Sequence, residues 1–163
     1  MKGKGDTVKT LEFRDGALWL LDQTKLPLEA VQVVCRDDRE VADAIREMKV
    51  RGAPAIGLAA AYGVVLAARS LASSRLATDE LIARLEEAME RLRRTRPTAV
   101  NLSWALARMR EIILANADAG PPALAGIPGS CVARAWKSPR CTAAACALSA
   151  SSTCPRTSAR TTM

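Results

Sequence analysis

The stretch RGAPAIG at residues 51–57 decides the fold, because it joins a loop to the longest apolar run in the chain. Pro54 suits the first turn of a helix, where the missing N–H of proline costs little. The pattern therefore predicts a helix that begins there and runs to about residue 72. Its glycines and alanines at 57, 59–61 and 63 leave room for neighbouring backbones. Because this helix is apolar nearly all round apart from Arg69, we expect it to be the buried centre of the domain.

The residues before this stretch predict a small β-structure and one short helix. Two apolar segments flank Asp15-Gly16, a dipeptide that tolerates positive φ, so they predict an antiparallel hairpin. The β-branched segment 31–34 predicts a third strand. Asp37 is expected to cap the next helix, with Glu40 in the capping-box position. That helix should bury one face, made of Val41, Ile45 and Met48.

The residues after the central run predict two further helices. The first opens at Thr78, the expected N-cap, and carries pairs with stabilising four-residue spacing, Glu87 with Arg91 and Glu90 with Arg94. Its inward residues are Leu81, Leu85, Ala88 and Leu92. Proline at 97 breaks the helical pattern, and a fourth helix is expected over 98–117. Its buried stripe is Leu102, Ala105, Leu106, Met109 and Ile113. The fold class is therefore α+β, with a small N-terminal antiparallel β-structure followed by a helical bundle.

The charge of the chain is distributed unevenly. All 17 acidic residues lie before residue 121, whereas the excess that makes the net charge +7 lies mainly in residues 121–163. These residues are rich in Ala, Arg, Ser, Thr, Pro and Cys and lack helical or strand periodicity, which is typical of disorder. Codons of a GC-rich gene read in the wrong frame would produce the same composition. We therefore divide the chain into a domain at 1–119 and a disordered or out-of-frame tail at 120–163, with a frameshift as the hypothesis.

Composition also excludes several classes of function. The arginines at 91, 93, 94 and 96 share a charged segment with Glu86, Glu87 and Glu90, so a solvated helix face is favoured over a nucleic-acid patch. No run of about 18 uninterrupted apolar residues predicts a membrane span, and no signal peptide is recognisable, so we expect a cytoplasmic protein. The cysteines form no CxxC pair and the chain has no histidine, so no metal site is expected. Cys35 is expected to be a small buried residue.

Two arginines just ahead of predicted helix starts point to an anion. A helix N-terminus presents unpaired N–H groups and the positive end of the helix dipole, so it binds phosphate readily. Arg51 precedes one such start and Arg96 the next. If the two starts are neighbours, both guanidinium groups can contact one phosphate. The alternative is that Gly, Pro and Arg at these positions only mark where helices end and begin, without binding a ligand.

Three segments together resemble the methylthioribose-1-phosphate isomerases. They are LLDQTKLP at 20–27, RGAPAIGLAAAYG at 51–63 and RPTAVNLSWALARM at 96–109, and the resemblance covers about residues 9–115. That family is related to ribose-1,5-bisphosphate isomerases and to the regulatory subunits of a translation-initiation exchange factor. The resemblance implies that Arg51, Gly52 and Ala53 bind a sugar-phosphate substrate and that Arg96 holds its phosphate. It implies an aldose-to-ketose conversion without a cofactor, and a homodimer.

The resemblance also implies what this sequence lacks. The family's catalytic cysteine lies in a Thr-His-Cys-Asn-Ala-Gly type segment and its catalytic aspartate further on, both in a C-terminal nucleotide-binding-like α/β domain. Neither segment is present, so we carry over no catalytic residue and expect a truncated chain that is inactive alone. The alternative is a non-catalytic regulatory or scaffold subunit like those of the translation factor. Neither nucleic acid nor membrane is expected as a partner.

Overall fold

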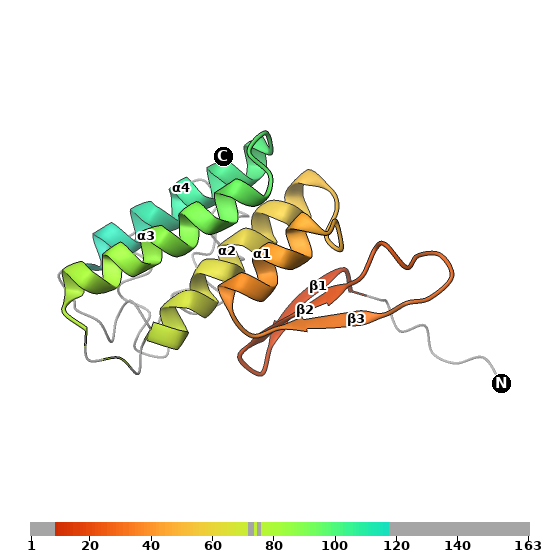
Figure 1. Ribbon diagram of the computed structural model, residues 1–163, viewed down its shortest axis with the longest axis horizontal. Coiled ribbons are helices and arrows are strands. Elements are labelled where there is room, and N and C mark those ends of the chain that lie inside the picture. The colour runs from red at the N-terminus through yellow and green to blue at the C-terminus, as the bar shows by residue number, and fades with distance from the viewer. Residues whose placement is uncertain (1–8, 72–73, 75, 118–163) are drawn as a thin grey trace, which may run out of the picture.

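A computed structural model describes residues 9–71, 74 and 76–117 (Figure 1). It has a three-stranded sheet beside four helices, so the predicted α+β architecture is confirmed. The strands are β1 (Leu11–Arg14), β2 (Ala17–Leu21) and β3 (Gln32–Cys35), and the helices are α1 (Asp38–Arg46), α2 (Ala53–Leu71), α3 (Thr78–Thr95) and α4 (Val100–Ala115). The predicted tail at 120–163 lies outside the described residues.

The sheet is antiparallel throughout, with β2 between β1 and β3. Asp15 and Gly16 form the hairpin turn with φ of 52° and 76°, and the predicted hairpin is confirmed. Alternation along the strands turns Leu18 and Leu20 of β2 and Cys35 of β3 into the core. Phe13 of β1 stacks on Tyr62 of α2 with 4.9 Å between ring centroids, so the sheet is attached to the central helix.

Helix α2 is the centre of the bundle, as its composition predicted. It contacts α1, α3 and α4 (Figure 1), and its residues from Ala59 to Ala68 are all buried. Gly63 shows why small residues are needed there, because a Cβ at this position would lie 3.1 Å from Leu92 and 3.3 Å from Val41. By length and composition alone α2 could cross a membrane, but 67% of that window is buried inside the domain. Such burial is typical of a core helix.

The local signals at the start of α1 are confirmed in part. The Asp37 carboxylate accepts from the Glu40 N–H at 2.8 Å, as an N-cap does. The Glu40 carboxylate turns back, but it accepts from the N–H of Arg36 at 2.6 Å rather than from that of the cap residue. Val41 and Ile45 are buried, whereas Met48 is 44% exposed. The prediction for Met48 was wrong because α1 ends at Arg46 and Met48 adopts φ of 59°.

Tertiary contacts also changed two predictions for α3. The helix includes Thr78, so the N-cap is Ala77, which makes no side-chain capping bond. The predicted ion pair between Glu87 and Arg91 was wrong, because Arg91 reaches Asp38 on α1 instead. The pair Glu90 with Arg94 is confirmed at 2.9 Å. The inward residues of α3 and the whole predicted stripe of α4 are buried, although α4 is two residues shorter at each end than predicted.

Candidate functional site

The loop between α1 and α2 meets the loop between α3 and α4 at an open pocket of about 440 Å³, which we call the loop pocket. All four residues predicted to bind substrate line it, namely Arg51, Gly52, Ala53 and Arg96. Its other lining residues are Met48, Ile56, Thr98, Ala99, Val100 and Asn101. The two helix starts are therefore neighbours, which was the condition for a shared anion site. Binding itself remains a prediction.

Gly52 sets the geometry where α2 begins. Its φ of +88° is a conformation that residues with a side chain rarely adopt. Its carbonyl accepts from the Ile56 N–H at 3.0 Å, which is the first hydrogen bond of the helix. The N–H groups of the first turn have no intrahelical acceptor, and Pro54 contributes none. Nothing lies within 4 Å of the place where a Cβ would be, so this helix start is open to a ligand.

Arg51 lies beside that helix start with most of its hydrogen-bonding capacity unused. Its Nε donates to the Met48 carbonyl at 3.3 Å, which leaves the terminal nitrogens of the guanidinium for another acceptor. Within residues 9–71, 74 and 76–117, Arg51 forms no ion pair. An exposed and unpaired guanidinium at a helix start favours an anionic ligand.

Arg96 belongs to the other loop and is half-buried. It is the C-cap residue of α3, and its carbonyl accepts from the Ala99 N–H at 3.0 Å, so the turn between the helices is short. Helix α4 then begins at Val100 without a side-chain cap, so N–H groups in the first turn of this helix are available as well. Arg96 likewise forms no ion pair with any described residue. No carboxylate lines the loop pocket, so its charge is positive.

The loop between β2 and β3 supports the Arg51 loop, a role that the sequence did not reveal. The Gln23 N–H donates to the Lys49 carbonyl at 3.0 Å, two residues before Arg51. The Asp22 carboxylate, only 4% exposed, accepts from the N–H and the hydroxyl of Thr24 at 2.9 and 2.6 Å. The Thr24 hydroxyl lowers the pKa of Asp22 below its ordinary value of 3.8. The only available signal was the DQT sequence, which suits a side-chain-bonded turn.

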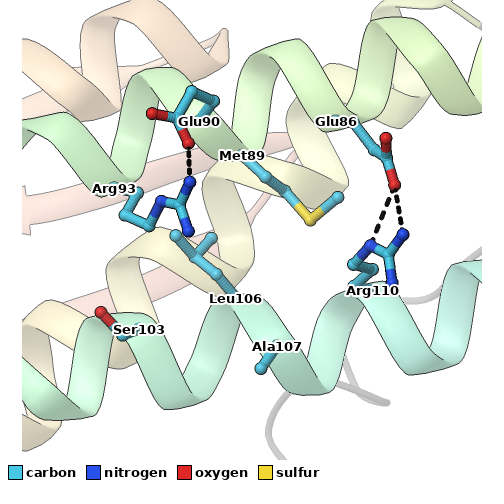
Figure 2. Close-up of a pocket in the computed structure, with 8 residues that line it drawn as sticks. All are labelled: Glu86, Met89, Glu90, Arg93, Ser103, Leu106, Ala107 and Arg110. Atoms are coloured by element: carbon cyan, nitrogen blue, oxygen red, sulfur yellow. Dashed lines mark hydrogen bonds and ion pairs between the residues drawn. The ribbon is translucent and has the colours of Figure 1, made fainter.

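A second pocket lies between α3 and α4 and has about 480 Å³. Figure 2 shows Met89 and Leu106 between two charged pairs, Glu86 with Arg110 and Glu90 with Arg93. Arg110 contacts Glu86 at 2.9 Å, so each of these cations already has a carboxylate partner. A third pocket, between the ends of α1, α2 and α3, is lined by Arg91 paired with Asp38 and by Arg84 paired with Glu87, and acidic side chains such as Asp37 line it as well. Neither is as well suited to an anion as the loop pocket.

The described residues give little support for a metal site or for a reactive cysteine. They contain no cluster of three or more His, Cys, Asp or Glu side chains that could hold a metal ion. Cys35 is 1% exposed, which confirms the prediction of a buried residue. Burial raises the pKa of its thiol from 9.0 to about 11, so this thiol is a poor nucleophile. The loop pocket offers hydrogen-bond donors to an anion, and none of its lining residues is an acid-base group suited to neutral pH.

The sequence is similar to a known protein family and to several curated proteins. Residues 49–121 match the Initiation factor 2 subunit family. The chain is 48% identical over 130 residues to a methylthioribose-1-phosphate isomerase of Alkalilimnicola ehrlichii, which covers 80% of this chain and 36% of that protein. It is 51% identical over 106 residues to the isomerase of Caldanaerobacter subterraneus subsp. tengcongensis, which covers 65% and 30%. The chain thus spans about a third of the length of the curated relatives it matches.

Two solved structures share the fold. The 5-methylthioribose 1-phosphate isomerase from Pyrococcus horikoshii is 35% identical with a TM-score of 0.63, covering 78% of this chain and 33% of that one. The translation initiation factor eIF-2B subunit delta from A. fulgidus is 37% identical with a TM-score of 0.64, covering 79% and 35%. Residues 49–121 are thus similar to the Initiation factor 2 subunit family, and the chain is similar to methylthioribose-1-phosphate isomerases.

Proposed function

We propose that this domain supplies the phosphate-binding part of a methylthioribose-1-phosphate isomerase site. The observation that carries the proposal is the convergence of Arg51 and Arg96, without acidic neighbours, at two adjacent helix starts. One phosphate can then accept hydrogen bonds from both guanidinium groups and from first-turn N–H groups of α2, beginning with Ala53. Gly52 keeps the approach to those groups free of side-chain atoms.

The likeness to curated isomerases favours this function over a regulatory one. Identity to the curated isomerases is 48–54% over 102–130 residues. The two solved structures do not separate the functions, because the isomerase is 35% identical and the translation-factor subunit 37%. Under this proposal the ligand is methylthioribose 1-phosphate, and neither nucleic acid nor a membrane takes part. We expect the homodimeric assembly and the cytoplasmic location that the resemblance and the composition suggest.

We further propose that the 163-residue chain binds the ester without isomerising it. In an aldose 1-phosphate the anomeric oxygen is blocked, so the ring must open before a proton can move between neighbouring carbons. That step needs general acid-base groups with suitable pKa values. The sequence has no histidine, and its one described cysteine, Cys35, is buried in strand β3 with a raised pKa. The segments that the resemblance assigns to catalysis are absent from it.

Calorimetric titration of the chain with methylthioribose 1-phosphate tests the binding proposal. Losing a hydrogen bond to a charged group costs about 1.5–3 kcal/mol, so Arg51→Ala and Arg96→Ala should each weaken binding at least about tenfold. Arg94→Ala is the matched control, because it removes the same charge two residues from Arg96 and outside the loop pocket. Equal affinities for all four proteins would rule out the phosphate site. Ketose formation above background by the purified chain would refute the proposed inactivity.

A further inference from the structure

The end of α1 sets the direction of the loop that carries Arg51. The Lys49 N–H donates to the Ala44 carbonyl at 3.0 Å. The Met48 N–H donates to the Ile45 carbonyl at 3.2 Å, and Met48 has φ of 59°. Two such bonds around a left-handed residue make a Schellman motif, in which glycine usually takes the left-handed position. The Met48 carbonyl accepts from the Arg51 Nε at 3.3 Å, so the position of Arg51 depends on the backbone at residues 48 and 49.

The loop between β2 and β3 holds the same backbone. The Gln23 N–H donates to the Lys49 carbonyl at 3.0 Å, so both backbone polar groups of Lys49 are bonded. Asp22 fixes the direction of that donor. Its carboxylate accepts from the N–H and the hydroxyl of Thr24 at 2.9 and 2.6 Å, and its own N–H donates to the Val31 carbonyl at 2.8 Å. The peptide group between Asp22 and Gln23 is therefore held from both ends.

The Asp22 carboxylate is buried, although a hydrogen-bonded turn alone does not require this. It is 4% exposed, and burial of a carboxylate is costly unless other groups compensate. Both bonds to Thr24 lie within one turn and could form equally well at the surface. The Thr24 hydroxyl and, to a smaller extent, the positive charge of Lys49 lower the pKa of Asp22. The turn is thus attached to the Arg51 loop by charge as well as by a backbone hydrogen bond.

Arg96, the other cation of the loop pocket, is held in a different way. It is the C-cap residue of α3, and its carbonyl accepts from the Ala99 N–H at 3.0 Å. Among the described residues, no hydrogen bond of the loop between β2 and β3 reaches the loop that carries Arg96. The supports of Arg51 and Arg96 are therefore separate, and a change at Asp22 should act on Arg51 alone.

We propose that Asp22 is a positioning residue of the phosphate site, which holds the Gln23 N–H against the Lys49 carbonyl and thereby directs the Arg51 guanidinium toward the ligand. This inference rests on the proposed function and adds a residue that does not line the loop pocket. Without the Asp22 carboxylate the turn loses two hydrogen bonds, and Arg51 must then be ordered when the ligand binds. Ordering such a side chain should weaken binding about fivefold.

Calorimetric titration of the full 163-residue chain with methylthioribose 1-phosphate tests this inference in double-mutant cycles. Asp22→Ala should weaken binding about fivefold in the wild-type chain and in the Arg96→Ala background. In the Arg51→Ala background its effect should be less than about 1.5-fold, because no guanidinium is left to position. Asp22→Asn keeps an acceptor oxygen and nearly the same shape, so it should restore most of the affinity. If circular dichroism shows that Asp22→Ala does not fold, Thr24→Val replaces it in the same cycles, since it removes only the hydroxyl bond.

Asp38→Ala is the matched control, because Asp38 is also a buried aspartate, 8% exposed, but pairs with Arg91 and does not line the loop pocket. It should lower the stability of the domain and leave the affinity unchanged. If Asp38→Ala weakens binding as much as Asp22→Ala does, the effect is a loss of stability and the positioning role is refuted. An unchanged affinity of Asp22→Ala, or an undiminished effect in the Arg51→Ala background, also refutes it, while the phosphate site stands. If the wild-type chain does not bind the ester, the proposed function fails and this inference fails with it.

Discussion

Replacing Gly52 tests whether the loop that carries Arg51 depends on a left-handed backbone. Gly52 has φ of +88°, and an alanine forced into the left-handed region costs about 1–2 kcal/mol. Steric contacts add nothing, because no atom lies within 4 Å of the Cβ position. Alanine also stiffens the unfolded chain, which offsets about 0.4–1 kcal/mol of that cost. Gly52→Ala should therefore lower the free energy of unfolding by about 1 kcal/mol.

The order of a substitution series provides the control. Asparagine tolerates left-handed φ better than alanine and valine tolerates it worst, so the loss of stability should rise from Gly52→Asn through Gly52→Ala to Gly52→Val. Urea unfolding followed by tryptophan fluorescence measures each value, and an unchanged m-value keeps the comparison valid. Affinity for methylthioribose 1-phosphate should fall in the same order, because the residue next to Arg51 must move to relieve the strain. Equal stability of the alanine and valine variants would contradict this reasoning.

Three further predictions concern the core, the buried thiol and a supporting turn. Leu92→Ala should lower the free energy of unfolding by about 2–5 kcal/mol, because it opens a cavity. In the Leu92→Ala background, the effect of Gly63→Ala on stability should be more favourable by about 1 kcal/mol than in the wild type, because the Leu92 methyl groups 3.1 and 3.2 Å from the new Cβ are gone. Additive effects of the two substitutions in a double-mutant cycle would contradict the contact. Cys35, with its pKa raised to about 11, should resist alkylation at pH 8 until urea unfolds the domain, as peptide-level mass spectrometry can show; labelling at the rate of a free thiol would disprove its burial. Thr24→Val should cost about 1 kcal/mol at pH 7. Because the pKa of Asp22 is lowered in the folded state, that contribution is complete above the ordinary value of 3.8 and is lost as pH falls below it. Unfolding measured from pH 7 to pH 3 should show the cost shrinking, and a cost independent of pH would count against the bond.

Local signals predicted the elements well because they act over a few residues. Asp15-Gly16 formed the hairpin turn, Asp37 capped α1, and the apolar stripe of α4 was buried as spaced. The errors occurred where a longer-range contact competed with a local one. Arg91 pairs with Asp38, a residue 53 positions away, in preference to Glu87 on its own helix. A partner on another helix is invisible to a four-residue spacing rule.

For the candidate site too, some features followed from local sequence and others only from the tertiary structure. The sequence alone selected Arg51, Gly52, Ala53 and Arg96, because arginine, glycine and proline next to a helix start have a physical reason to bind phosphate. Only the tertiary structure brought residues 51 and 96 to one pocket, since the packing of α2 on α4 decides which helix starts are neighbours. The position of Met48 was likewise decided by the tertiary structure. Periodicity placed Met48 in the core, and its exposure at the pocket follows from the end of α1 at Arg46 and from a left-handed backbone that no local pattern predicted.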